Sequence, residues 1–384
     1  MKGETARWRR LTAIGLCAAT IWGSVITAGS GSAEEAWQSV EEELLSPVRA
    51  VRWELGDLTG DLSPAAALTI AQSPLLLSAR EQILRRRESE TETAPPAESG
   101  GNPEPIREEV VTPAPASTDR DNGVPARTLV PASPDGYTVV GSVYISNGTD
   151  HVLDTAALAA GDFDASLTEA EPQVLILHTH GSESYTLPPG ESYVASGDHR
   201  TTDTTCNVVR VGDEMAEVFG LAGISVLHDR TLYDYPSYAG SYDRSLVAIQ
   251  NYLKQYPSIR FILDVHRDAI EDGQGNQYKV VSAIDGEGTA AQLSIVVGSD
   301  GSGLTHPNWI ENLRLAVAIQ ENILAKYPTL MRPVLLRNSR YNQHATAGSL
   351  LVEVGSAGNS PEEAVLAGRL FAERMAEVLN AQTN

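Results

Sequence analysis

The sequence predicts an α/β protein with a twisted, mostly parallel or mixed sheet sandwiched by helices, preceded by a membrane anchor and a disordered linker. Three observations carry this prediction. Short apolar runs typical of buried strands alternate with amphipathic helical patterns from residue 137 to the C-terminus. A proline-rich acidic stretch precedes them, and an uncharged apolar run lies near the N-terminus.

The N-terminal segment combines basic residues with apolar ones. Arg7, Arg9 and Arg10 precede residues 11–29, which carry no charge and are long enough to span a bilayer. We expect residues 1–33 to be a membrane anchor or a signal segment. The length favours a single-pass anchor, cleavage stays open, and either alternative places the bulk of the chain outside the cytoplasm because the positive residues remain inside.

The next two segments differ in composition. Residues 34–87 are mixed and we expect a partly helical juxtamembrane region. Residues 88–136 contain nine of the 21 prolines, among Glu, Ala, Ser and Thr, and have too little apolar surface to fold. We therefore predict a disordered linker that holds a folded domain, residues 137–384, away from the membrane.

Composition excludes several classes of partner and site. The net charge is −22 and no basic run follows the N-terminal segment, which argues against nucleic acid. The two cysteines, Cys17 and Cys206, exclude a disulfide framework and a cysteine-rich zinc site. Any metal must be held by histidine and carboxylate.

Within the folded domain the periodicity predicts strands and helices in alternation. Ser360, Pro361 and Glu363 form the start signal of the last helix, with a capping box. We expect helices over 207–221, 241–255, 307–327 and 361–379, and strands over 138–145, 174–177, 224–227, 259–265, 293–298, 334–336 and 349–354.

Polar side chains lie at or just beyond the carboxyl ends of three of these strands. His178 to Glu183 come after residues 174–177, His266 to Asp268 after the strand that ends at 265, and Glu353 lies within the strand 349–354. A lone histidine after a strand is more often structural. Parallel strands, however, would gather all three clusters at one edge of the sheet.

This set of side chains suits a metal site. Two histidines and a carboxylate around an open position are the ligand set of catalytic zinc, and a further carboxylate commonly acts as general base. Glu353, fixed by an apolar strand in LLVEVGS, suits the second role.

The motifs HTHGSESY, ILDVHRDAI and NQHATAGSLLVEVGSAGNSPEEA, with NVVRVGDEM and DYPSYAGSYDRSL, resemble the stage II sporulation protein P family (SpoIIP) from about Tyr137 to the C-terminus. The resemblance implies a zinc-amidase-like fold and an N-acetylmuramoyl-L-alanine amidase, which cuts stem peptides from the glycan strands of peptidoglycan. It also implies a lytic transglycosylase activity, septal wall remodelling during endospore engulfment, and the membrane partners SpoIID and SpoIIM.

The resemblance further implies residue roles. His180 overlays best with the first zinc ligand of such amidases, which leaves His178 beside the site or facing substrate. The spacing points both side chains to one side if the strand persists, so the choice between them stays open. Glu183, with Asp203 as the alternative, and His266 complete the ligand set, and Glu353 is the base.

Further residues are expected around these ligands. They would orient ligands or bind substrate carboxylates: Asp264, Arg267 and Asp268. Residues 342–344 either line the cleft or form a plain structural loop. Two other classes remain open: a zinc peptidase or carboxypeptidase of the cell wall, and a non-catalytic wall-binding domain.

Overall fold

The computed structural model describes residues 108–111, 121–161, 163, 166–168 and 171–382, all within the compact unit Thr93–Asn384. No helix in these described ranges combines the length and apolarity that a bilayer span needs. The predicted anchor (1–33) and juxtamembrane region (34–87) lie outside the described residues.

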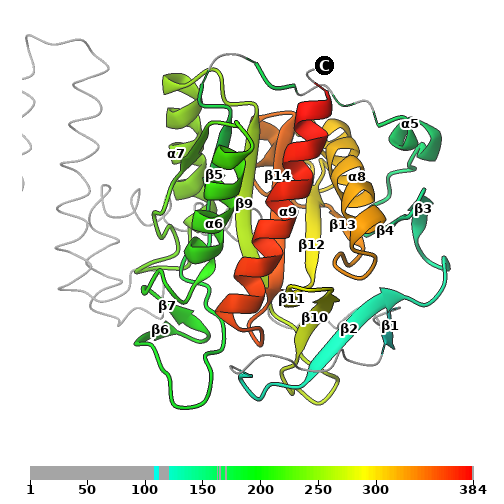
Figure 1. The fold of residues 1–384 in the computed structure, drawn as a ribbon. Coiled ribbons are helices and arrows are strands. Elements are labelled where there is room, and N and C mark those ends of the chain that lie inside the picture. The colour runs from blue at the N-terminus through cyan, green and yellow to red at the C-terminus, as the bar shows by residue number, and fades with distance from the viewer. Residues whose placement is uncertain (1–107, 112–120, 162, 164–165, 169–170, 383–384) are drawn as a thin grey trace, which may run out of the picture. The chain divides into compact units, whose positions relative to one another are not determined.

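Eight of the described strands form one mixed sheet in the order β3-β4-β13-β12-β14-β9-β5-β8 (Figure 1). The neighbours β12, β13 and β4 run parallel to one another, as do β14, β9, β5 and β8, whereas β12 and β14 are antiparallel. The strands are β3 (Thr138–Val140), β4 (Val143–Asn147), β5 (Val174–Leu177), β8 (Val226–His228), β9 (Phe261–Asp268), β12 (Leu293–Gly298), β13 (Val334–Arg337) and β14 (Gly348–Ser356). The prediction of a mixed α/β sheet is confirmed.

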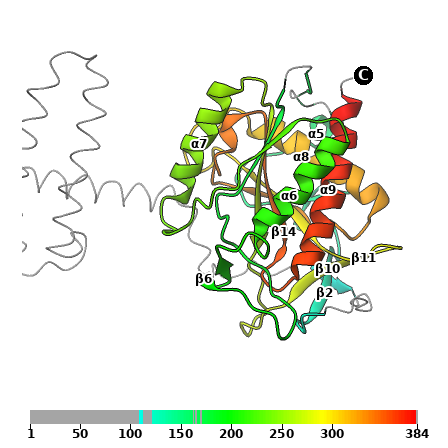
Figure 2. The same ribbon diagram turned by 60° about the vertical axis from the view of Figure 1, so that its left-hand side comes forward.

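Helices cover both faces of this sheet (Figures 1 and 2). Ile176 and Leu263 belong to the large core that contains the buried sides of α6 (Val208–Leu221), α8 (Trp309–Lys326) and α9 (Pro361–Ala381). Leu175 and Ile262, which alternate with them along the strands, pack instead with α7 (Ser241–Gln255). The sheet therefore carries α6, α8 and α9 on one face and α7 on the other.

The helices match the sequence periodicity closely. α6, α7 and α8 begin and end within two residues of the predicted bounds, and α9 runs two residues further than expected. The capping box of α9 is present: Ser360 Oγ accepts from the Glu363 N–H at 3.2 Å, and the Glu363 carboxylate accepts from the Ser360 N–H at 3.0 Å. A short helix α5 (Thr155–Ala159) and a single 3₁₀ turn η1 (Gln343–Ala345) complete the helical elements described.

A second sheet extends the folded region upstream of Tyr137. It consists of β1 (Glu108–Val111), β2 (Ala126–Pro131), β10 (Lys279–Ile284) and β11 (Gly288–Ala291). Leu129 of β2 is buried with Tyr278 and Val280, and Gln292 bonds both its N–H and its carbonyl. The composition of residues 88–136 predicts a linker, because the prolines around β2 mask its short apolar run.

Two other local features differ from the predicted elements. The expected single strand over 138–145 is a hairpin, β3 and β4, turned at Gly141, whose φ of +56° favours glycine. The stretch after β5 forms a second small hairpin, β6 (Ala195–Gly197) with β7 (Arg200–Thr201), beside the lower ends of β5 and α6 in Figure 1.

Candidate metal centre

The three predicted polar clusters meet at the carboxyl ends of β5, β9 and β14 in the main sheet. β5 and β14 flank β9 on either side and run parallel to it, with Leu177 opposite Asp264 and Glu353 opposite His266. The strands deliver their polar ends to the same place, as the parallel arrangement requires.

His180, Glu183 and His266 form a compact buried cluster. Each offers one ligand atom, and these atoms all lie within 4.8 Å of one another. His180 Nδ1 lies 3.4 Å from one oxygen of Glu183, and His266 Nδ1 lies 3.5 Å from the other. All three side chains are at least nine-tenths buried. The carboxylate therefore bridges the two imidazoles.

A tight turn places Glu183. The Glu183 N–H donates to the His180 carbonyl at 3.0 Å, and Ser182 donates from both N–H and hydroxyl to Asp234. A Cβ on Gly181 would lie 2.8 Å from Leu232 Cδ2 and 3.3 Å from Leu232 Cα and the Thr231 carbonyl oxygen, so glycine eases the close approach of the 231–234 segment. The Arg267 N–H donates to Glu183 Oε2 at 3.1 Å and fixes the carboxylate from β9.

Asp264 holds the far side of the His266 ring. Its Oδ1 lies 2.9 Å from His266 Nε2, and Thr179 donates to the same carboxylate from N–H and hydroxyl. Burial alone would raise the pKa of Asp264, but the charge of His266 and these hydrogen bonds lower it. Burial would likewise lower the pKa of His266, and Asp264 with Glu183 raises it. Asp264 orients the ring and leaves Nδ1 facing Glu183.

Glu353 lies beside the cluster. Because register partners on parallel neighbours share a face, Glu353 and His266 point to the same side of the sheet. Val265 and Val352, one residue earlier on each strand, lie in the core on the opposite face. Glu353 is half-buried and close enough to Tyr242 to add to the raised pKa that burial gives that phenol.

The structure separates the two histidines of the first motif. His180 is in the cluster, whereas His178 is buried against α6: its Nδ1 donates to the Val265 carbonyl at 2.9 Å, and its Nε2 lies 2.8 Å from His228 Nε2. Burial and His228 lower the pKa of His178 to about 3, so it stays neutral. Strand β5 ends at Leu177, so the alternation that would align both side chains does not continue.

Three other predicted residues are not part of the cluster. The Arg267 guanidinium donates to the Ser184 and His199 carbonyls at 3.2 and 2.9 Å. Asp268 accepts from Arg332 at 2.7 Å. Asp203, the alternative to Glu183, is exposed and binds the N–H and hydroxyl of Thr205.

The loop at 342–344 ties elements together. Asn342 donates to the Tyr242 carbonyl at 2.8 Å, and the Gln343 amide bonds both the Gly298 N–H and the Val296 carbonyl. The observed contacts of Asn342 and Gln343 fit the structural alternative, while the loop also borders Tyr242 at the site.

Arg200, Asp234 and Tyr238 received no role from the sequence. Tyr238 stacks on His180, and Arg200 bonds Asp234 at 2.7 Å and Glu183 at 3.5 Å. Asp234 and Tyr238 belong to DYPSYAGSYDRSL, so an acid and an aromatic in a motif of unassigned role were the available signal.

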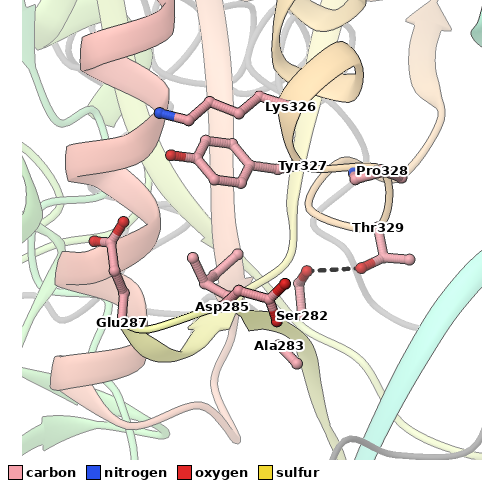
Figure 3. Close-up of a pocket in the computed structure, with 9 residues that line it drawn as sticks. Ser282, Ala283, Asp285, Glu287, Lys326, Tyr327, Pro328 and Thr329 are labelled. Atoms are coloured by element: carbon pink, nitrogen blue, oxygen red, sulfur yellow. Dashed lines mark hydrogen bonds between the residues drawn. The ribbon is translucent and has the colours of Figure 1, made fainter.

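A separate hollow of about 300 Å³ lies elsewhere (Figure 3). It is lined by residues from β10, the turn to β11 and the end of α8, including Ser282, Glu287, Lys326 and Tyr327. It shares no residue with the cluster and is not part of the candidate centre.

Fold and site together define an α/β protein with a buried His–Glu–His cluster and a neighbouring glutamate at the carboxyl edge of a mixed sheet. The sequence model of stage II sporulation protein P (SpoIIP) matches residues 75–376, and the chain belongs to this family. Stage II sporulation protein P of Bacillus subtilis (strain 168) is 29% identical over 219 residues, which are 53% of this chain and 50% of that protein. The match thus spans about half the length of that relative.

Solved structures that match part of this chain include the following two amidases. The N-acetylmuramyl-L-alanine amidase Ami1 from Mycobacterium smegmatis is 14% identical, with a TM-score of 0.35, and covers 56% of this chain and 100% of its own. The CwlD amidase from Clostridioides difficile, solved in complex with the GerS lipoprotein, is 16% identical, with a TM-score of 0.32, and covers 55% and 97%.

Proposed function

We propose that this protein is a zinc-dependent N-acetylmuramoyl-L-alanine amidase, which cleaves the amide bond between N-acetylmuramic acid and the L-alanine of the stem peptide in septal wall remodelling during endospore engulfment. Membership of the SpoIIP family supports the biological setting. The single observation that carries the chemistry is the buried cluster of His180, Glu183 and His266.

The donor set fits zinc. Two imidazoles and one carboxylate leave a fourth position open, as catalytic zinc sites do. Asp264 on the far nitrogen of His266 supplies the carboxylate–histidine pairing that such ligands need. When bound, the ion supplies Lewis acidity, which polarises the amide carbonyl and lowers the pKa of an attacking water molecule.

Glu353 performs the proton transfers in this proposal. Amide hydrolysis needs a base that takes a proton from the attacking water and passes it to the leaving amine. Glu353 stands opposite His266 in the register of β9 and β14, on a strand whose other residues are buried. The rigid strand fixes the carboxylate at the site.

The wider setting belongs to the same proposal. We place the domain outside the cytoplasm, held by residues 1–33 as a single-pass anchor or released if that segment is cleaved. Peptidoglycan is the substrate, and SpoIID- and SpoIIM-like membrane proteins are the partners. A lytic transglycosylase step has no assigned residue.

Mass spectrometry of purified peptidoglycan digested with the full chain and zinc tests the activity. An amidase releases intact stem peptides and leaves a free lactyl group on muramic acid. Shortened stem peptides with the lactyl amide intact would identify a zinc peptidase instead. Unchanged peptidoglycan with zinc bound would leave a non-catalytic wall-binding domain.

Glu353→Gln is the matched variant because it keeps the size of the side chain and removes its basicity. We expect it to retain zinc and peptidoglycan binding and to lose about a hundredfold or more in amide cleavage. Near-normal cleavage would remove Glu353 as the base. Loss of zinc would make it a ligand.

A further inference from the structure

An exposed tyrosine lies directly on one member of the cluster. The rings of Tyr238 and His180 are 4.5 Å apart between centroids and inclined by 29°, a stacked arrangement. Tyr238 is 43% exposed, although large aromatic side chains normally bury their surface. The stacking contact with His180 is consistent with a functional role for this exposed ring.

The guanidinium of Arg200 contacts both Tyr238 and Glu183. Arg200, on β7, lies 4.8 Å from the centroid of the Tyr238 ring, within cation–π distance. The same side chain bonds Glu183 at 3.5 Å and Asp234 at 2.7 Å. Of the three proposed ligands, Arg200 therefore contacts Glu183 directly and His180 through Tyr238.

The segment that carries Tyr238 is fixed by its own hydrogen bonds. Arg244 of α7 donates to the carbonyls of Tyr233, Ser237 and Ala239 between β8 and α7. Asp234 binds Ser182 in the turn between His180 and Glu183. Hydrogen bonds thus fix the loop that carries Tyr238, so stacking of Tyr238 on His180 costs little additional conformational entropy.

We propose that Arg200 and Tyr238 are positioning residues, which hold Glu183 and His180 in the orientation that the metal requires. The inference rests on the proposed metal function. An imidazole with a ring packed on its face loses freedom about its side-chain torsions, and a carboxylate bonded to a fixed guanidinium loses its own. Such supporting contacts commonly change metal affinity 10- to 100-fold.

The experiment measures the zinc dissociation constant of the full chain by competition with a chromophoric chelator. We expect Tyr238→Leu, which keeps apolar bulk and removes the ring, to weaken zinc binding about 10- to 100-fold. Tyr238→Phe keeps the ring and should bind like the wild type. Tyr235→Leu is the control, because Tyr235 lies in the same loop, is 51% exposed and shows none of these ring contacts within the described part of the chain.

Arg200→Met tests the second contact, and we expect about tenfold weaker zinc binding. Its control is Arg210→Met, which removes a pair with Glu214 on the surface of α6. At saturating zinc the activity lost in Tyr238→Leu should return, with KM unchanged. A raised KM with normal zinc affinity would overturn the proposal and make Tyr238 a substrate contact.

Two failures are distinguishable. If the wild type binds zinc and cleaves peptidoglycan while Tyr238→Leu and Arg200→Met bind zinc normally, the positioning role is overturned alone. If the wild type binds no zinc, the proposed metal function is overturned with it.

Discussion

Gly212 in the middle of α6 gives a sharp test of how His178 is packed. Glycine in a helix interior costs about 1 kcal/mol relative to alanine, so an unobstructed Gly→Ala change stabilises a protein. At Gly212, however, a Cβ would lie 2.5 Å from His228 Nε2 and 2.6 Å from His178 Nε2. These nitrogens are themselves only 2.8 Å apart, so the methyl group would strike a partly buried contact between the two rings.

The expected magnitude follows from the opposing effects. Overpacking a filled interior costs about 1–3 kcal/mol. Loss of the contact between His178 and His228 adds about 1 kcal/mol. The gain in helix propensity offsets about 1 kcal/mol of this, so Gly212→Ala should lower the free energy of unfolding by about 1–3 kcal/mol.

Gly220 supplies the control in the same helix, since no atom of the described residues lies within 4 Å of a Cβ placed there. Gly220→Ala should raise the free energy of unfolding by about 0.5–1 kcal/mol. Urea unfolding of both variants and the wild type, followed by circular dichroism, measures the difference. Equal stabilisation by the two changes would refute the close packing of His178 against α6.

Three further outcomes are expected. His180→Ala or His266→Ala should abolish zinc binding in elemental analysis, because two remaining ligands cannot hold zinc tightly, whereas His178→Ala should retain it. Burial lowers the pKa of His306 to about 4; His344 and Arg340 lower it further, and Asp300 partly opposes them. The unfolded chain therefore binds a proton at this histidine near pH 6.5, whereas the folded chain does not. The stability contributed is present above about pH 6.5 and lost as pH falls towards 4, so the wild type should lose about 1–2 kcal/mol more than His306→Gln between pH 7 and pH 5 in urea titrations. Ser360→Ala should cost about 1 kcal/mol in thermal unfolding through the lost cap of α9.

Local periodicity was enough to predict the helices because each has a strong apolar face. α7 matches its predicted range residue for residue, and the cap of α9 forms as its sequence indicates. β10 and β11 were not predicted, since their strands are short and joined through Asp285 and Gly286 within charged and glycine-rich sequence. β2 was also not predicted, because its pairing partner β10 lies about 150 residues away in the sequence.

The site shows the same division between local and distant information. That His266 and Glu353 would meet follows from strands that run parallel and end together. The choice between His178 and His180 depended on where β5 stops, which the apolar run alone does not define. Arg200 was out of reach of sequence reasoning, because its contact with Glu183 depends on the β6–β7 hairpin folding back over the turn.

The alternation of side chains between the two faces of β9 and β14 specifies both the core and the site. In β9, Val265 faces the core under α6 and α9 while His266 faces the cluster, and in β14 the same holds for Val352 and Glu353. A slip of one residue in the pairing of β9 with β14 would put a valine beside the His–Glu–His cluster and a charged side chain into the core. The cost of burying that charge unpaired, several kcal/mol, therefore maintains the register on which the proposed catalytic pair depends. Packing of the apolar face is thus what brings a histidine and a glutamate almost 90 residues apart into direct register.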